Sequence, residues 1–245
     1  GPMLANLSGS SAVIWLRTAG PSQVVVEAYT DPLVSSNRVE ASARSKQEND
    51  HVVKLMLKGL KPKTDYQYVI FIDGEKNESS KQRFTTFNRI GSAGNFRLAF
   101  GGGAGFVPQH EYVWNTIAAT KPQALFQLGD NVYIDNTDVM DMHHYCYYRR
   151  QSRSEYRALV AGVSVFSIWD DHDYGPNNSD RSFIHKNITL QAFKDFWANP
   201  SYGIENNRGI TTQFRWSDVD FFLLDNRFFR SPQNRQHTYK EILGK

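Results

Sequence analysis

Apolar and polar residues alternate along much of the first ninety residues, as they do in strands that are buried on one face only. Side chains at every second position from Tyr66 to Ile72 are apolar or aromatic, and the Lys-Pro-Lys-Thr segment just before them is a turn signal. The predicted strands cover residues 11–18, 23–30, 51–57, 66–72 and 81–87. Several short strands at this spacing predict an antiparallel β-sandwich.

The turn before the fourth of these strands has a specific pattern. Residues 57–68, LKGLKPKTDYQY, resemble the L-x-x-L-x-P-x-T-x-Y-x-Y pattern of fibronectin type III domains, in which a tyrosine packs at a strand corner. We expect Trp15, Tyr66 and Tyr68 to serve as core residues, because no cluster of ionisable groups accompanies them. The resemblance implies a fibronectin type III-like domain over residues 1–90, followed by the linker GSAGN at 91–95.

From residue 96 onward the pattern changes to short apolar runs that alternate with amphipathic ones. The predicted strands are 97–103, 124–130, 163–173 and a pair within 211–227, and the predicted helices are 110–120, 141–161 and 188–200. This alternation predicts an α/β layered domain over residues 91–245. In such sheets, active sites form where loops leave the carboxyl ends of the strands.

Composition narrows the function classes. The chain has 245 residues, 40% hydrophobic and 22% charged, which is typical of a globular protein. The net charge of +3 comes without a basic tract, so no clear nucleic-acid surface is expected, and no apolar run is long enough for a transmembrane segment. With Cys146 as the single cysteine, an internal disulfide and a cysteine-based zinc cluster are both impossible, and we expect Cys146 to be a buried residue rather than a nucleophile.

Acidic residues follow two of the predicted strands directly. Asp130 comes after the apolar run 124–128, and the sequence Asp170-Asp171-His172-Asp173 comes after 163–169. Carboxylates gathered at neighbouring strand tips repel one another unless a cation lies between them. Oxygen and nitrogen donors of this kind suit iron, manganese, calcium, magnesium or zinc. The alternative is that these acids are helix N-caps or lie in surface turns.

These two blocks also resemble known motifs. Residues 129–135, GDNVYID, resemble the G-D-x-x-Y block of purple-acid-phosphatase-type metallophosphoesterases. Residues 168–178, IWDDHDYGPNN, resemble the W-D-D-H-[DE] block of PhoD-like phosphatases, as do residues 145–169 and the opening of the chain. Together these segments span nearly the whole chain. The resemblance implies hydrolysis of phosphate mono- or diesters with two or more divalent or trivalent metal ions (Fe, Ca, Mn or Zn).

The resemblance also implies a role for each matching residue. Asp130 would bridge two metal ions, Asp171 would bind the second and Tyr133 the first, and His172 would act as the catalytic group on the phosphate or on the leaving oxygen. Asp135, Asp170 and Asp173 would bind metal or orient the ligands. Phosphate contacts would come from Asn131, Asn177, Asn178, Arg150 and Arg157; the two arginines fit an ordinary helix face equally well.

Two departures from the family pattern change the expectation. Where the family's first motif carries a ligand, this chain has Phe100 followed by Gly101-Gly102-Gly103, and no histidine motif follows Asp225. His237 lies in a polar segment that reads as a surface loop. We therefore expect a catalytic domain without its C-terminal half, in which the incomplete sheet promotes self-association.

Several properties of the parent protein are expected from the resemblance alone. They are a substrate that is a small phosphate ester, a phospholipid or a nucleotide, and a secreted, periplasmic or cell-surface location. Two alternatives remain at this stage. The chain is an inactive form whose β-sandwich acts as a binding module, or it is an inactive truncation product.

Overall fold

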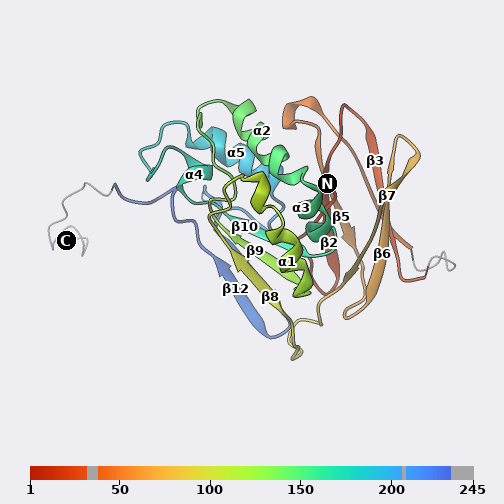
Figure 1. Cartoon of the computed structure of the whole chain (residues 1–245). Helices are drawn as coiled ribbons and strands as arrows, with labels where there is room; N and C mark the ends of the chain where they lie inside the picture. Colours follow the sequence, from red (N-terminus) through yellow and green to blue (C-terminus); the bar gives the residue numbers. More distant parts are fainter. Residues whose placement is uncertain (32–37, 206–207, 233–245) are drawn as a thin grey trace.

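The computed structural model describes residues 1–31, 38–205 and 208–232, without the side chains of 78–81. His237 lies outside the described residues. In the described residues of the first part of the chain, the regular elements are strands and one short 3-10 helix (Figure 1). Its elements are β1 (Met3–Ala5), β2 (Ser11–Arg17), β3 (Gln23–Tyr29), β4 (Arg38–Arg44), η2 (Gln47–Asn49), β5 (Val52–Lys58), β6 (Asp65–Ile72) and β7 (Glu75–Thr85).

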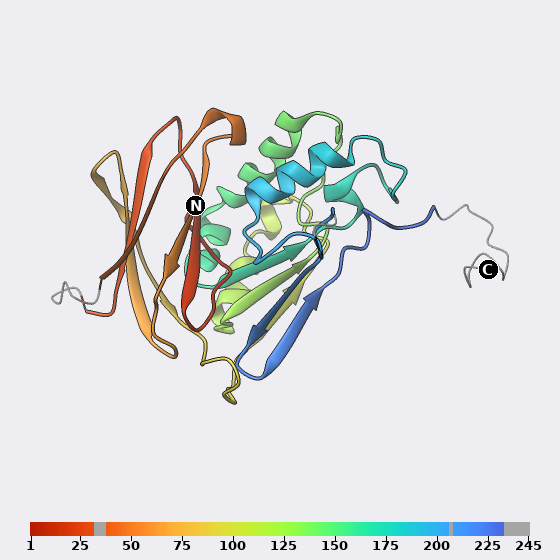
Figure 2. The same cartoon turned by 180° about the vertical axis from the view of Figure 1, so that it is seen from behind.

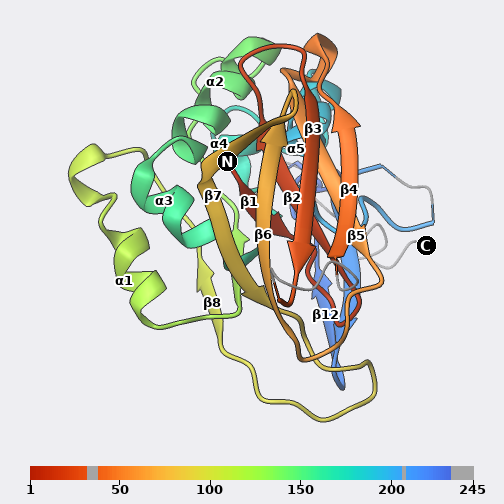
Figure 3. The same cartoon turned by 90° about the vertical axis from the view of Figure 1, so that its right-hand side faces the viewer.

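These strands form two facing layers. Figure 3 looks onto the antiparallel sheet β4-β3-β6-β7, behind which β5, β2 and β1 form the second layer. Inward side chains of both layers, such as Val26 and Leu55, share one core. Trp15, Tyr66 and Tyr68 are buried as expected, and the Tyr66 hydroxyl accepts a hydrogen bond from the Lys61 N–H at 2.9 Å. This bond ties the strand to the turn before it, as a tyrosine corner does.

The second part of the chain alternates strands and helices. Its elements are β8 (Leu98–Gly101), η3 (Pro108–His110), α1 (Val113–Ala119), β9 (Ala124–Leu128), α2 (Met140–Gln151), α3 (Ser154–Val160), β10 (Ser164–Ile168), α4 (Asp171–Tyr174), α5 (Lys186–Phe196), β11 (Thr212–Trp216) and β12 (Val219–Leu223). Strands β8, β9 and β10 are parallel neighbours. The helices cover one face of these strands and the β11–β12 hairpin covers the other (Figure 2).

Successive side chains of β9 and β10 point to opposite faces of the sheet, one toward the helices and the other toward the β11–β12 hairpin. Leu125 and Val165 belong to the core beneath the helices, whereas Phe126 and Phe166 pack against the hairpin. The Phe166 ring stacks on Phe214 of β11 with centroids 4.4 Å apart. Both faces of these strands are therefore buried, which explains why their sequences are almost continuously apolar.

One sheet runs through both parts of the chain. Strand β1 pairs antiparallel with β2 and parallel with β10, so the order is β5-β2-β1-β10-β9-β8. The Trp216 indole N–H also donates to the Leu7 carbonyl at 2.9 Å. The expected β-sandwich and α/β region thus share a continuous sheet, and a domain boundary at residues 90 and 91 stays a prediction.

Several details differ from the sequence-based expectation, and one of them is the helix expected over 141–161, which is two helices, α2 and α3. Strands β1 and β4 were not predicted, because β1 is very short and β4 carries small residues between charged ones. The strand expected over 163–173 ends at Ile168, since Asp170 starts a helical turn instead. As expected, none of the helices in the described ranges is long and apolar enough to cross a membrane.

Candidate metal centre

The tips of β9 and β10 meet at the carboxyl edge of the sheet, where Leu128 is the register partner of Ile168. Gly129 follows with φ +102°, and a β-carbon there would lie 2.6 Å from the Asp170 Cβ. Only glycine permits this close approach. Asp130 also has a positive φ, of 50°, which turns its carboxylate toward the β10 loop. The Gly-Asp pair therefore sets the separation of the two acidic segments.

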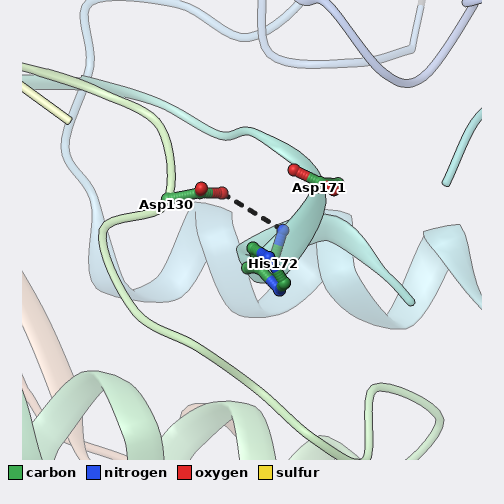
Figure 4. Close-up of side chains that lie close together, drawn as sticks. All are labelled: Asp130, Asp171 and His172. Carbon is green, nitrogen blue, oxygen red and sulfur yellow. Dashed lines mark hydrogen bonds between the residues drawn. The ribbon is translucent and has the colours of Figure 1, made fainter. Parts of the chain in front are cut away.

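Figure 4 shows the three side chains that gather at this edge, Asp130, Asp171 and His172. One ligand atom from each lies within 4.8 Å of the other two. The His172 backbone N–H donates to Asp130 Oδ1 at 3.2 Å, which links the β9 loop to α4. Two carboxylates and one imidazole at this spacing form a donor set that fits a metal ion.

The two carboxyl groups differ electrostatically. Burial raises the pKa of Asp130, and the neighbouring Asp170 and Asp171 add to this, while the His172 N–H opposes it. Burial also acts against ionised Asp171, but the Asn178 N–H and the Arg227 guanidinium outweigh it, so its pKa is lowered. Asp171 is thus held as a carboxylate, and a cation beside Asp130 would favour the ionised form of that group as well.

Tyr133 lies beside the cluster. Its hydroxyl donates to Asp130 Oδ2 at 3.4 Å, and its ring stacks on the His172 imidazole with centroids 4.3 Å apart. Burial, with the charge of Asp130, raises the pKa of the phenol. The phenol oxygen thus lies next to the Asp130 carboxylate, and its role as a metal ligand stays a prediction.

Asp173 points away from the cluster and is fully buried. Its carboxylate accepts the Asp170 N–H and the Asn131 side-chain amide, each at 2.6 Å. Burial raises the pKa of Asp173 to about 8, only partly opposed by these hydrogen bonds. Asp170 and Asp173 form a capping box at α4, so for these two acids the helix-cap alternative is right. They orient the loop rather than face a shared ion.

The predicted phosphate contacts are placed unevenly. The Asn131 amide is already used, since it donates to Ser167 Oγ and the Ile168 carbonyl in addition to Asp173. Asn177 and Asn178 are exposed, and the Asn178 backbone N–H donates to Asp171 Oδ2 at 2.6 Å. Asp135 is exposed and is not part of the three-residue cluster.

The structure does not bring the two predicted arginines to the cluster as phosphate ligands. Arg150 is only 2% exposed and makes an ion pair with Glu111 at 2.8 Å. Arg157 is on the surface of α3 and donates to the Gly1 carbonyl. Because β1 runs parallel to β10, Gly1 lies at the amino edge of the sheet, opposite the cluster. Arg157 therefore lies at the wrong end of the sheet for that role.

Arg227 is the functional candidate that the sequence analysis missed. It is 5% exposed and contacts Asp170 Oδ1 at 2.5 Å and Asp171 Oδ1 at 3.4 Å. Asp225 fixes the segment by accepting the Trp169 indole N–H and the Ile210 N–H. The signal in the sequence is its position shortly after the apolar run that forms β12, whereas the expected family motif in this region is one of histidines.

The glycine segment after β8 lines the other side of the cluster with backbone only. The Gly103 N–H donates to the Gly129 carbonyl at 3.1 Å, and the Ala104 N–H donates to the Asp130 carbonyl at 2.8 Å. These bonds brace the Asp130 loop. Residues 101–103 are all glycine, so this segment brings no side-chain ligand to the Asp130 loop.

Known proteins resemble this chain at the level of fold. A structure of PhoD superposes with a TM-score of 0.80 at 17% identity, covering 95% of this chain and 52% of that one. A purple acid phosphatase from yellow lupin (Lupinus luteus) seeds superposes with a TM-score of 0.68 at 14% identity, covering 92% and 45%. The chain thus spans about half the length of either. At this level of identity, the likenesses show that the chain shares the fold of these two proteins over most of its length.

Sequence comparison alone says less. A family described as a domain of unknown function (DUF7800) matches residues 1–89. No curated protein matches the chain.

Proposed function

We propose that this chain carries part of the active centre of a metal-dependent phosphoric ester hydrolase, acting on phosphate mono- or diesters. The observation that carries the proposal is the Asp130–Asp171–His172 cluster. It lies at the carboxyl ends of β9 and β10, where open α/β sheets place their ligands. The likeness of the fold to PhoD and to a purple acid phosphatase supports this reaction class.

Asp130 and Asp171 would hold the metal ion, with the Tyr133 phenol as a further ligand. A bound ion of this kind polarises the phosphoryl oxygen and lowers the pKa of a water molecule. Oxygen donors with one imidazole suit Fe, Mn, Ca or Zn. Asp173 and Asp170 keep the loop in place through the capping box.

His172 would carry the proton chemistry. Its ring is stacked on Tyr133 and lies beside Asp130, so its orientation is restricted from two sides. An imidazole there would hydrogen-bond to the phosphate or protonate the leaving oxygen. Small phosphate esters, phospholipids and nucleotides remain candidate substrates, and a secreted, periplasmic or cell-surface location is part of the same proposal.

A second candidate is a binding role for the β-sandwich beside an inactive phosphatase-like site. The observation that favours it is the glycine segment 101–103, which gives the cluster backbone atoms only. If the parent chain binds no metal, this second candidate is supported over the first.

The test is the metal content of the purified chain, measured by elemental analysis, beside Asp130→Asn/Asp171→Asn. We expect bound metal in the parent chain and a loss of at least about tenfold in affinity in the double variant, because both carboxylates are ligands. Asp218→Asn, an exposed change in the β11–β12 turn, is the control and should keep the metal. Metal that stays in the double variant would contradict the assignment, and assays on mono- and diesters follow only if it is lost.

A further inference from the structure

Arg227 is a buried cation that lies directly against the candidate metal centre. Its guanidinium contacts Asp170 and Asp171 and also donates to the Ser179 carbonyl at 3.1 Å. Asn226 supports the same contact by donating to Asp170 Oδ1 at 2.8 Å. A guanidinium carries five N–H donors and no acceptor, so it can serve several carboxylate and carbonyl oxygens at once.

The hydrogen bonds divide the acidic residues into two sides. Asp170 faces Arg227 and Asn226, and Asp171 Oδ1 also faces the guanidinium. Asp130 faces the other way, toward the His172 N–H and the Tyr133 hydroxyl. Asp171 therefore stands between the Arg227 guanidinium on one side and Asp130, His172 and Tyr133 on the other.

Charge balance follows from this division. Asp130, Asp170 and Asp171 bring three negative charges when ionised, and Arg227 brings one positive charge. The remainder matches one divalent ion. A second divalent ion next to Asp170 would lie within a few ångströms of the guanidinium, where screening by solvent is weak and repulsion is strong.

The supply of ligands leads to the same count. Among the described residues, the cluster contains Asp130, Asp171 and His172, and Tyr133 is close enough to join it. The segment 101–103 on the opposite side contributes no side chain. We infer that these residues build a site for a single divalent cation among Asp130, Asp171 and His172, and that Arg227 takes the place of a second cation.

This inference rests on the metal site of the proposed function and replaces the sequence-based expectation of two or more ions for the described residues. It makes Arg227 a positioning residue that limits metal number. A purely structural arginine would affect folding alone, so metal stoichiometry separates the two roles.

The experiment is equilibrium dialysis of the full chain against Mn²⁺, followed by electron paramagnetic resonance of the bound ion. We expect one Mn²⁺ per chain with the hyperfine pattern of an isolated ion. Two ions per chain with an exchange-coupled spectrum would overturn the inference and leave the proposed function standing. Absence of any bound Mn²⁺ would overturn both.

Two variants test the part played by Arg227. In Arg227→Met the carboxylates lose their fixed cation, and we expect a second Mn²⁺ to bind; one ion at unchanged affinity would overturn the inference. Arg215→Met is the matched control, because Arg215 pairs with Asp220 on an exposed hairpin, and it should leave one ion bound.

Asp170→Asn keeps the guanidinium, so it answers the question if Arg227→Met fails to fold. It removes one of the three carboxylate charges of Asp130, Asp170 and Asp171. We therefore expect one Mn²⁺ to bind roughly tenfold more weakly. Unchanged Mn²⁺ affinity in a folded Asp170→Asn chain would contradict the charge balance. A thermal melt of each variant establishes that it is folded.

Discussion

Two buried arginines, Arg150 and Arg227, differ in how their charge is matched. Arg150 pairs with one carboxylate, Glu111, which also accepts the Trp114 indole N–H, and its second amino group donates to the Ala104 carbonyl. Arg227 faces the two carboxylates Asp170 and Asp171. The Arg150–Glu111 pair has no net charge. Arg227 with Asp170 and Asp171 has one more negative than positive charge when both carboxyl groups are ionised. The two arginines therefore differ in whether their acidic partners keep a negative charge that a further cation can balance.

The largest expected effect comes from breaking the Arg150–Glu111 pair. Glu111→Gln leaves the Arg150 charge buried without a counter-ion, and we expect a loss of about 3–5 kcal/mol in the free energy of unfolding. Urea denaturation measures it. The double variant Glu111→Gln/Arg150→Met should recover most of the loss. If Glu111→Gln alone stays within about 1 kcal/mol of the parent, Arg150 does not depend on Glu111 as its counter-ion.

Lys54 is a partly buried cation whose nearest partners are backbone oxygens, and it extends the comparison to the effect of pH on stability. It donates to the Lys194 and Trp197 carbonyls, and burial lowers its pKa to about 8 from its usual 10.5, although Asp195 opposes the shift. The unfolded chain therefore holds this proton more tightly than the folded chain does. Stability should rise as pH increases from about 8 to 10.5, by at most about 3 kcal/mol.

Lys54→Met should remove that dependence, as judged from denaturation curves at several pH values in this window. Lys58→Met, on the exposed end of the same strand, is the control and should keep the dependence of the parent chain. A slope that survives in Lys54→Met would assign the effect to another group.

The smallest expected change in stability comes from the close approach of Gly129 to Asp170, the carboxylate that pairs with Arg227. Gly129→Ala forces a β-carbon against Asp170 at positive φ, and we expect a loss of about 1–3 kcal/mol together with weaker metal binding. Gly74→Ala is a matched control, since its φ is also positive but no atom lies within 4 Å of the added carbon. Equal metal affinity in both variants would show that strand-tip spacing does not set the site.

The sequence predicted the strand tips well because both rules involved are local. A continuous apolar run such as 124–128 must be buried on both faces, and an aspartate right after it must lie at the sheet edge. The nearness of Asp130, Asp171 and His172 at one edge of the sheet could therefore be predicted from the sequence. The resemblance to G-D-x-x-Y and W-D-D-H-[DE] blocks narrowed the chemistry further.

The sequence could not predict partners that come from distant segments. In the sequence, Arg150 looks like a surface arginine of a basic helix, and only the fold shows its ion pair with Glu111. Likewise, nothing near Arg227 in the sequence indicates its contact with Asp170, which forms when the chain passes β12. Asp173 is an acid like its neighbours in the sequence, yet the turn of α4 directs it into the interior. Side-chain direction at the start of a helix follows from cap geometry, which an apolar-run pattern does not contain.

The pairing of β1 with β10 has a consequence for how the protein folds. Ala5 is the register partner of Val165, and Leu7 is hydrogen-bonded to Trp216, so the middle of the central sheet joins segments that are far apart in sequence. Long loops must close before these contacts form, which makes such topologies slow to fold. On the ribosome, the first strand therefore has to wait for β10 to emerge before the two can pair.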